Sequence, residues 1–417
     1  MTYKSFASQS ASPGAATTTH QSTKGMNRLL LWAVLIVMAI WTGLQFMGMG
    51  AGGSFEFWGI GRATGAIEIL LVLSIMLNLP QLRKPSATTI AVLCWIPWVF
   101  ANVAVSVPGD LGEWLHSGAM PALLWPLVYL FFYTHAKRDA KSFQLLQRYF
   151  LVLSISCGAL FFQVFQVVNA GRTTGLLQLN AVYYPLLTIQ WAAVARKLSW
   201  RIGAVAGIAL AVFFSLKRGA ILALALGGAG YVLVGAILST GAHRLRWILS
   251  LSAVAVIFLA AYSRVDESLG GAFAERLIGM RDDGGSGRST IYMSVLDALS
   301  DADPENLLLG HGHDSTLERF GITAHNDFLE VTFDYGIIGL VLYVWLHFCL
   351  LRKTYALIRA RSPHAPAFGA AYAVFLVMSM TSHLIIYPTY FAYMAAFWGT
   401  IEGMTREGVQ RGRQLHA

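Results

Sequence analysis

Long apolar runs alternate with short polar stretches along most of this chain, and one polar stretch is far longer than the others. A helix needs about 20 consecutive apolar residues to cross the hydrocarbon core of a bilayer. Runs of this kind predict an all-α, polytopic membrane protein with about twelve transmembrane helices. The predicted spans lie near residues 29–48, 60–79, 87–107, 119–135, 149–170, 176–195, 199–214, 219–239, 245–262, 327–351, 367–386 and 388–404.

The polar stretches divide the chain into parts. Residues 1–26 are rich in Ser, Thr, Ala and Gln, which favours a disordered cytoplasmic tail without a cleavable signal. Residues 27–262 hold the first nine spans, and the long polar insert occupies 263–326. Three more spans fill 327–405 and a short basic tail covers 406–417.

The insert contains a predicted helix over residues 288–299. Ile291, Val295 and Leu299 share one face of that helix because apolar residues recur there at helical spacing. We expect this helix to lie on the outer surface of the membrane.

Composition supports the membrane assignment, since 56% of the residues are hydrophobic and only 12% are charged. Soluble domains carry about twice that charged fraction. The net charge of +9 could indicate a nucleic-acid partner. With the N-terminus in the cytoplasm, however, 21 of the 30 lysines and arginines fall in inner segments, as the positive-inside rule requires. The charge therefore reports topology and not nucleic-acid binding: both termini are expected inside and the insert outside.

A few cations on the outer side are candidates for function, and those in short outer segments contradict that rule. Arg172 lies in a short outer loop, Lys217 and Arg218 lie between two spans, and Arg288 lies in the insert. Charges at membrane depth are costly and usually functional, although long cationic side chains also reach lipid phosphates at the interface. A guanidinium fork suits phosphate oxygens, so these groups could bind a lipid-linked pyrophosphate. They could also stabilise a departing diphosphate in place of a divalent ion.

The histidines of the outer side are the candidates for proton transfer. His325 directly precedes a span, beside Asn326, and a neutral imidazole there could accept a proton from a hydroxyl or simply hold a loop. His311 and His313 could bind a metal, but two ligands are too few for a zinc site, so a tight turn is expected and no metal or cofactor. His383 is interpreted as a packed or interfacial residue.

Four short motifs resemble successive landmarks of the O-antigen ligase and polymerase superfamily. They are Ser-Leu-Lys-Arg-Gly-Ala at 215–220, Gly-Arg-Ser at 287–289, Gly-His-Gly at 310–312, and Ala-His-Asn-Asp-Phe-Leu-Glu at 324–330 with Tyr-Gly-Ile-Ile-Gly-Leu at 335–340. Their order and their shared outer location carry the resemblance, which covers essentially the whole chain.

The resemblance implies an inverting, metal-independent glycosyltransferase of the GT-C type at the periplasmic face of a Gram-negative inner membrane. Its donor would be a glycan on undecaprenyl pyrophosphate and its acceptor a sugar hydroxyl of the lipid A core. His325 would activate the acceptor, with Asn326 and His313 in support, and Arg218 and Arg288 would hold the pyrophosphate. Lys217 replaces a more usual small residue, and Arg172 is assigned to the donor site from topology alone.

Three other functions stay open. An O-antigen polymerase uses the same donor but often divides its polar residues between two outer loops, whereas one loop dominates here. Protein oligosaccharyltransferases usually carry a further C-terminal outer domain. A transporter or flippase for polar lipids would be expected to show internal repeats and ionisable residues near the midplane, and the sequence has neither pattern.

Overall fold

The computed structural model describes residues 14–50, 58–106, 120–170, 179–249, 264, 266–271, 274–275, 288–385 and 388–414. Every regular element in these residues is helical, which confirms the predicted all-α class. The long helices are α1 (Gly14–Gly50), α2 (Trp58–Leu77), α3 (Ala87–Ser106), α5 (Met120–Arg138), α6 (Phe143–Val168), α9 (Leu198–Phe214), α10 (Arg218–Leu238), α16 (Asp327–Arg359), α17 (Ala365–Thr381) and α18 (Pro388–Gln414). Short helices are α7 (Tyr183–Leu186), α8 (Ile189–Ala193), α13 (Arg288–Ser300), α14 (Pro304–Leu309) and α15 (Ser315–Phe320), with 3-10 turns η1 (Leu79–Leu82), η3 (Ala140–Ser142) and η4 (Asn180–Val182).

Five of the described helical stretches are long and apolar enough to cross a membrane: Gly25–Gly48, Ala87–Ser106, Ala140–Val168, Arg218–Leu238 and Asp327–Arg359. Three shorter apolar stretches accompany them, Ala63–Leu77, Leu198–Phe214 and Ala365–Thr381. The protein is therefore an integral membrane protein. A total of twelve spans stays a prediction, because the span expected at 245–262 lies mostly outside the described residues.

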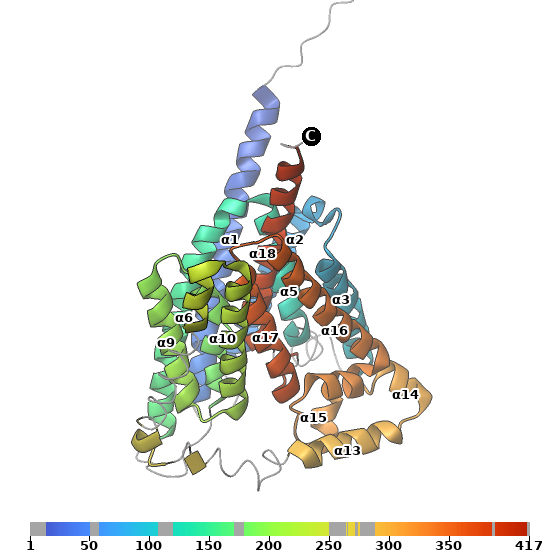
Figure 1. Ribbon diagram of the computed structural model, residues 1–417. Helices are drawn as coiled ribbons and strands as arrows, with labels where there is room; N and C mark the ends of the chain where they lie inside the picture. The colour runs from blue at the N-terminus through green and yellow to red at the C-terminus, as the bar shows by residue number, and fades with distance from the viewer. Residues whose placement is uncertain are drawn as a thin grey trace, which may run out of the picture.

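The insert helices and the chain ends lie at opposite ends of the bundle (Figure 1). The first turns of α1 and the C-terminal end of α18 are at one end, and α13, α14 and α15 are together at the other. Between these ends, α18 packs along α5 and α10 packs along α17. This is the arrangement expected if both termini lie on one side of the membrane and the insert on the other.

The prediction of one continuous span at 176–195 is wrong. Over the described part of this stretch the chain forms η4, α7 and α8, separated by turns. Pro185 lies within α7 and has no amide hydrogen to donate back to η4, so η4 and α7 do not join into one α-helix. The broken segment is buried among other helices, where Trp191 Nε1 donates to the Tyr393 carbonyl of α18 at 3.2 Å. Irregular backbone at membrane depth is tolerated where protein surrounds it in this way.

Helix α1 begins at Gly14, so residues 14–26, which were expected to belong to the tail, continue the first span as helix. Extending a helix that is already nucleated costs little. Residues 1–13 lie outside the described residues.

The tenth predicted span is divided by a break at Gly336, whose φ of 69° and ψ of −174° are not helical. The break removes the helical partners of three carbonyls, and each finds a donor from another part of the chain. The amide of His311 donates to Phe333 at 2.9 Å, the amide of Gly312 donates to Asp334 at 3.0 Å, and Trp98 Nε1 donates to Tyr335 at 3.1 Å. Residues 327–335 therefore form a separate helical segment that belongs structurally to the insert.

The glycines of the predicted motifs permit this junction. The backbones at Gly310 and Gly336 pass so close that a Cβ on Gly310 would collide with the Asp334 carbonyl, and one on Gly336 with the Leu308 carbonyl. Both also have φ in the region that favours glycine, at 94° and 69°.

The predicted insert helix is confirmed as α13, but its apolar face does not lie on lipid. Val295 is fully buried and clusters with Ala324 and Phe333, with Ile291 and Leu299 packed against them. The face that we expected at the membrane surface instead packs on the first segment of α16.

Candidate functional site

His325 lies in the short connection between α15 and α16 and is held in an unusual backbone conformation, with φ of 52°. Few non-glycine residues adopt this left-handed region, and strain of this kind is concentrated at functional sites. The next residue, Asn326, caps α16: its side-chain oxygen accepts from the amides of Phe328 at 3.0 Å and Leu329 at 3.3 Å. Asn326 thus fixes the backbone beside His325 and uses its side-chain oxygen for the helix.

A second histidine contacts His325. The Nδ1 atoms of His325 and His383 are 2.8 Å apart, and the ring centroids are separated by 4.7 Å. His383 follows α17 and is 6% exposed. Its Nδ1 atom also lies 3.1 Å from Oγ1 of Thr323. The interpretation of His383 as a merely packed residue was incomplete, because it bonds to the predicted catalytic residue.

Two of the predicted cations act electrostatically on this pair. Burial, together with the positive charges of Arg288 and Lys217, lowers the pKa of His325 to about 4. Burial, His325, Lys217 and Arg288 together hold the pKa of His383 well below its usual value. Both imidazoles are therefore neutral at physiological pH.

Lys217 lies in a tight turn between α9 and α10, and Arg218 directly follows it. Leu216 has φ of 57°, and the Lys217 amide donates to Ser215 Oγ at 3.2 Å, so the chain reverses within a few residues. Arg218 is the first residue of α10 and is half-buried. A Cβ at Gly219 would lie 2.9 Å from Thr381 Oγ1, so the absence of a side chain lets α10 start directly against the end of α17 and the loop of His383.

Arg288 occupies the corresponding place on α13 as its first residue. The starts of α10, α13 and α16 therefore lie near the histidine pair. Helix N-termini carry partial positive charge and unpaired amides, so they attract anions. Together with Lys217 and Arg288 they make this region suited to a phosphate-bearing ligand.

Two residues that sequence reasoning missed fix the backbone around the pair. The Tyr292 hydroxyl, one turn after Arg288, lies 3.4 Å from the carbonyl oxygens of both His325 and Met380. The buried Asp327 carboxyl accepts from the Tyr343 hydroxyl at 2.8 Å and from the Ile385 amide at 3.3 Å. Asp327 belongs to the motif at 324–330, and the sequence signal for Tyr292 is its place on the same helix face as Arg288.

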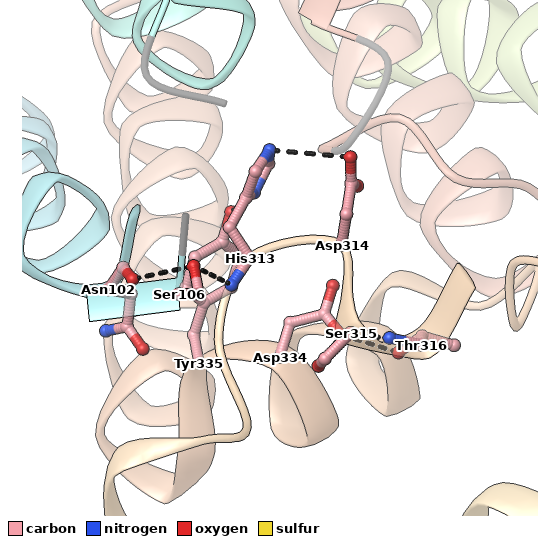
Figure 2. A network of polar contacts seen from close by, with 8 residues as sticks. All are labelled: Asn102, Ser106, His313, Asp314, Ser315, Thr316, Asp334 and Tyr335. Carbon is pink, nitrogen blue, oxygen red and sulfur yellow. Dashed lines mark hydrogen bonds and ion pairs between the residues drawn. The ribbon is translucent and has the colours of Figure 1, made fainter. Parts of the chain in front are cut away.

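His313 belongs to a second cluster, drawn in Figure 2. Its Nδ1 lies 2.6 Å from the Tyr335 hydroxyl, its amide donates to Ser106 Oγ at 3.1 Å, and its Nε2 lies 3.7 Å from the Asp314 carboxylate. Burial lowers the pKa of His313, against the opposing effect of Asp314 and Glu318. These contacts join the insert to α3 and α16, so the support that His313 gives the site is mechanical, through α16.

Asp334 completes the second cluster by fixing α15 (Figure 2). One carboxylate oxygen accepts from Ser315 Oγ at 2.9 Å and from Thr316 through its amide at 2.8 Å and its hydroxyl at 2.6 Å. Three bonds to one oxygen hold the α15 start against the segment 327–335.

The His311–Gly312–His313 turn separates its two imidazoles. His311 stacks on Phe333 with centroids 4.1 Å apart, and its Nδ1 lies 3.2 Å from the Phe333 carbonyl. Since His313 uses other partners, the two rings do not form a ligand pair. Among the described residues no group of three or more metal-ligating side chains is gathered. Arg172 lies outside the described residues, so its assignment to the donor site stays a prediction.

Comparison with protein families gives one match. A family model described as O-antigen ligase matches residues 203–344, from α9 into the second segment of α16. The resemblance inferred from the motifs is confirmed over this stretch, which contains Lys217, Arg218, Arg288 and His325 but not His383. The family implies an enzyme of the ligase or glycosyltransferase type that acts on lipid-linked glycans. No curated protein matches the chain in sequence.

Proposed function

We propose that this membrane protein is an O-antigen ligase, which transfers a glycan from undecaprenyl pyrophosphate to a sugar hydroxyl of the lipid A core. The observation that carries the proposal is a neutral imidazole, His325, placed near the starts of three helices and beside the charges of Lys217 and Arg288. A base next to a pyrophosphate site is what transfer from a lipid diphosphate requires.

In the proposed reaction the acceptor hydroxyl gives its proton to His325 as its oxygen forms a bond to the anomeric carbon. The bond from that carbon to the pyrophosphate oxygen breaks, and its electron pair leaves with the diphosphate. Attack from the face opposite the leaving group inverts the configuration. A positioned general base contributes about 10²- to 10⁴-fold to such a step.

Cations supply the second part of the proposed mechanism. Negative charge develops on the diphosphate as the bond breaks, and fixed cations in a partly dehydrated site stabilise it strongly. We assign this role to Arg218, Arg288 and Lys217, and extend it to Arg172 on topology. With these groups present the reaction needs no divalent ion, so we propose a metal-independent GT-C-type glycosyltransferase.

The proposed location is the inner membrane of a Gram-negative cell, with both termini in the cytoplasm and the site facing the periplasm. The donor lipid and the lipid A core acceptor both reside in that membrane. The placement of α13, α14 and α15 opposite the chain ends supports this orientation (Figure 1).

The test is surface lipopolysaccharide profiling in a host that lacks its own ligase and supplies a suitable core. We expect a ladder of O-antigen on the lipid A core with the native chain and none with His325→Asn. Asparagine tolerates the left-handed backbone of His325 but offers no base.

Two results would overturn the proposal in favour of another function. Long glycan chains that remain on undecaprenyl pyrophosphate, without a ladder, would identify an O-antigen polymerase. Movement of the lipid-linked glycan across the membrane with no new glycosidic bond would identify a transporter or flippase.

A further inference from the structure

We propose that His383 is a positioning residue for His325: its Nδ1 atom accepts the Nδ1 proton of His325 and thereby leaves Nε2 of His325 as the nitrogen that receives the acceptor proton. The role in transfer rests on the proposed function, whereas the proton assignment is a property of the two rings themselves.

The contact between the two rings requires one proton between them. Two imidazole nitrogens 2.8 Å apart are at hydrogen-bonding distance, and two bare lone pairs would repel. A neutral imidazole carries one proton, so either His325 or His383 donates through Nδ1.

The two assignments have opposite consequences for catalysis. If His383 donated, His325 would carry its proton on Nε2 and use its Nδ1 lone pair for the bond, which leaves no nitrogen to take a proton. If His325 donates, its Nε2 lone pair is available. When Nε2 takes the acceptor proton, the resulting imidazolium still donates through Nδ1 to neutral His383.

Thr323 bonds to the same nitrogen of His383, since its hydroxyl lies 3.1 Å from that Nδ1 atom. A hydroxyl can donate or accept, so this contact fits either assignment. The assignment therefore rests on the 2.8 Å contact between the two rings and on the need for a bare nitrogen on His325.

The loop of His383 is tied to the helix start that follows His325. Asp327, two residues after His325, accepts from the amide of Ile385, two residues after His383. The Tyr343 hydroxyl, which bonds to Asp327 at 2.8 Å, also contacts Ser379 of α17 at 2.7 Å. The separation of the two rings is therefore set by buried contacts on both backbones.

The charges around the pair explain why a neutral partner suits this site. Lys217 from the turn before α10 and Arg288 from α13 both act on His325, and the Tyr292 hydroxyl lies at its carbonyl. In many hydrolases a carboxylate orients the catalytic imidazole. A carboxylate here would offset the cations and repel a diphosphate, whereas a neutral imidazole orients the base without adding negative charge.

The activity test uses purified protein and compares His383→Leu with His383→Asn. Leucine removes the acceptor, while the Oδ1 atom of asparagine can take the place of Nδ1. Partners that orient metal-bound imidazoles contribute about 10- to 100-fold, and we expect an effect of that size here: kcat should fall by that factor in His383→Leu with little change in the donor KM. His383→Asn should recover most of the loss. His364→Leu, at the opposite end of α17, is the matched control and should retain native kcat.

The proton assignment is tested separately by nitrogen NMR of ¹⁵N-histidine protein, because protonated and bare ring nitrogens have distinct shifts. The His325 signals are identified as those absent from His325→Asn. We expect a protonated Nδ1 and a bare Nε2 in the native protein, and loss of this pattern in His383→Leu.

Two results would overturn the proposal. One is a His325 proton on Nε2, and the other is an unchanged His325 pattern in His383→Leu together with equal activity losses in the leucine and asparagine variants. If the native protein transfers no glycan but shows the expected NMR pattern, the proposed function fails while the proton assignment holds.

Discussion

The helical segment 327–335 has a buried histidine cluster at each end, and the two clusters differ in the charges around them. At its start, His325 and His383 meet Lys217 and Arg288. At its end, His313 contacts Tyr335 and faces the acids Asp314 and Glu318. Burial lowers the pKa in both places, but only the first cluster combines a neutral imidazole with cations. The two clusters therefore differ in neighbouring charge and not in the histidines themselves. The charges make the first cluster suited to phosphate chemistry, whereas the second is a structural junction.

The strongest test of this comparison replaces each histidine by asparagine. His325→Asn should reduce glycan transfer by about 10²- to 10⁴-fold at nearly native stability, because it removes the base and keeps the backbone. His313→Asn should lower the melting temperature and leave transfer per folded molecule close to native. The measurement is turnover of purified, detergent-solubilised protein beside a thermal unfolding curve. Equal losses of turnover in the two variants would erase the distinction between the clusters.

The next largest effect concerns pH. Transfer needs neutral His325, so kcat/KM should fall on the acid side as pH drops through a pKa of about 4. Lys217→Met removes a positive charge that lowers this pKa, so the acid limb should move to higher pH. Donor KM should also rise, because a phosphate contact is lost. Glu318→Gln, which changes a charge near the other histidine, is the control. A limb that stays in place in Lys217→Met would show that the lysine does not act on the base.

A smaller effect, on stability, tests whether the second cluster has a structural role. Asp334→Ala removes an oxygen that accepts three hydrogen bonds from Ser315 and Thr316, at an expected cost of about 2–4 kcal/mol. The melting temperature should fall, while Ser315→Ala, which removes one of these bonds, should have a weaker effect in the same direction. A loss of turnover without a loss of stability would place Asp334 in the chemistry instead.

The smallest expected effect is that of Thr323→Val, which removes the hydroxyl beside His383 and keeps the shape. One hydrogen bond at a positioning residue is worth about two- to tenfold, so kcat should drop within that range. A drop as large as that of His383→Leu would mean that Thr323, and not His383, fixes the pair.

Sequence patterns predicted the features that arise from local composition. A cation between two spans marked Lys217, an outward arginine in the insert marked Arg288, and helical spacing marked α13. His383 is packed, as expected, but one histidine in an apolar run gives no sign of its contact with His325, which exists only once α17 and α16 are packed. Pro185 alone does not mark the first break, because Pro97 and Pro126 lie inside the continuous helices α3 and α5, and apolar residues on both sides of Gly336 concealed the second break.

The bond from Trp98 to the Tyr335 carbonyl also constrains how the chain can fold. Its partners are 237 residues apart, and it satisfies a backbone oxygen that the break at Gly336 leaves open. Contacts of such long range form late, after the intervening chain has been synthesised and inserted. A fragment consisting of residues 288–335 alone would lack this donor and the Ser106 hydroxyl. The insert can therefore form all of its hydrogen bonds only after the other helices have packed together.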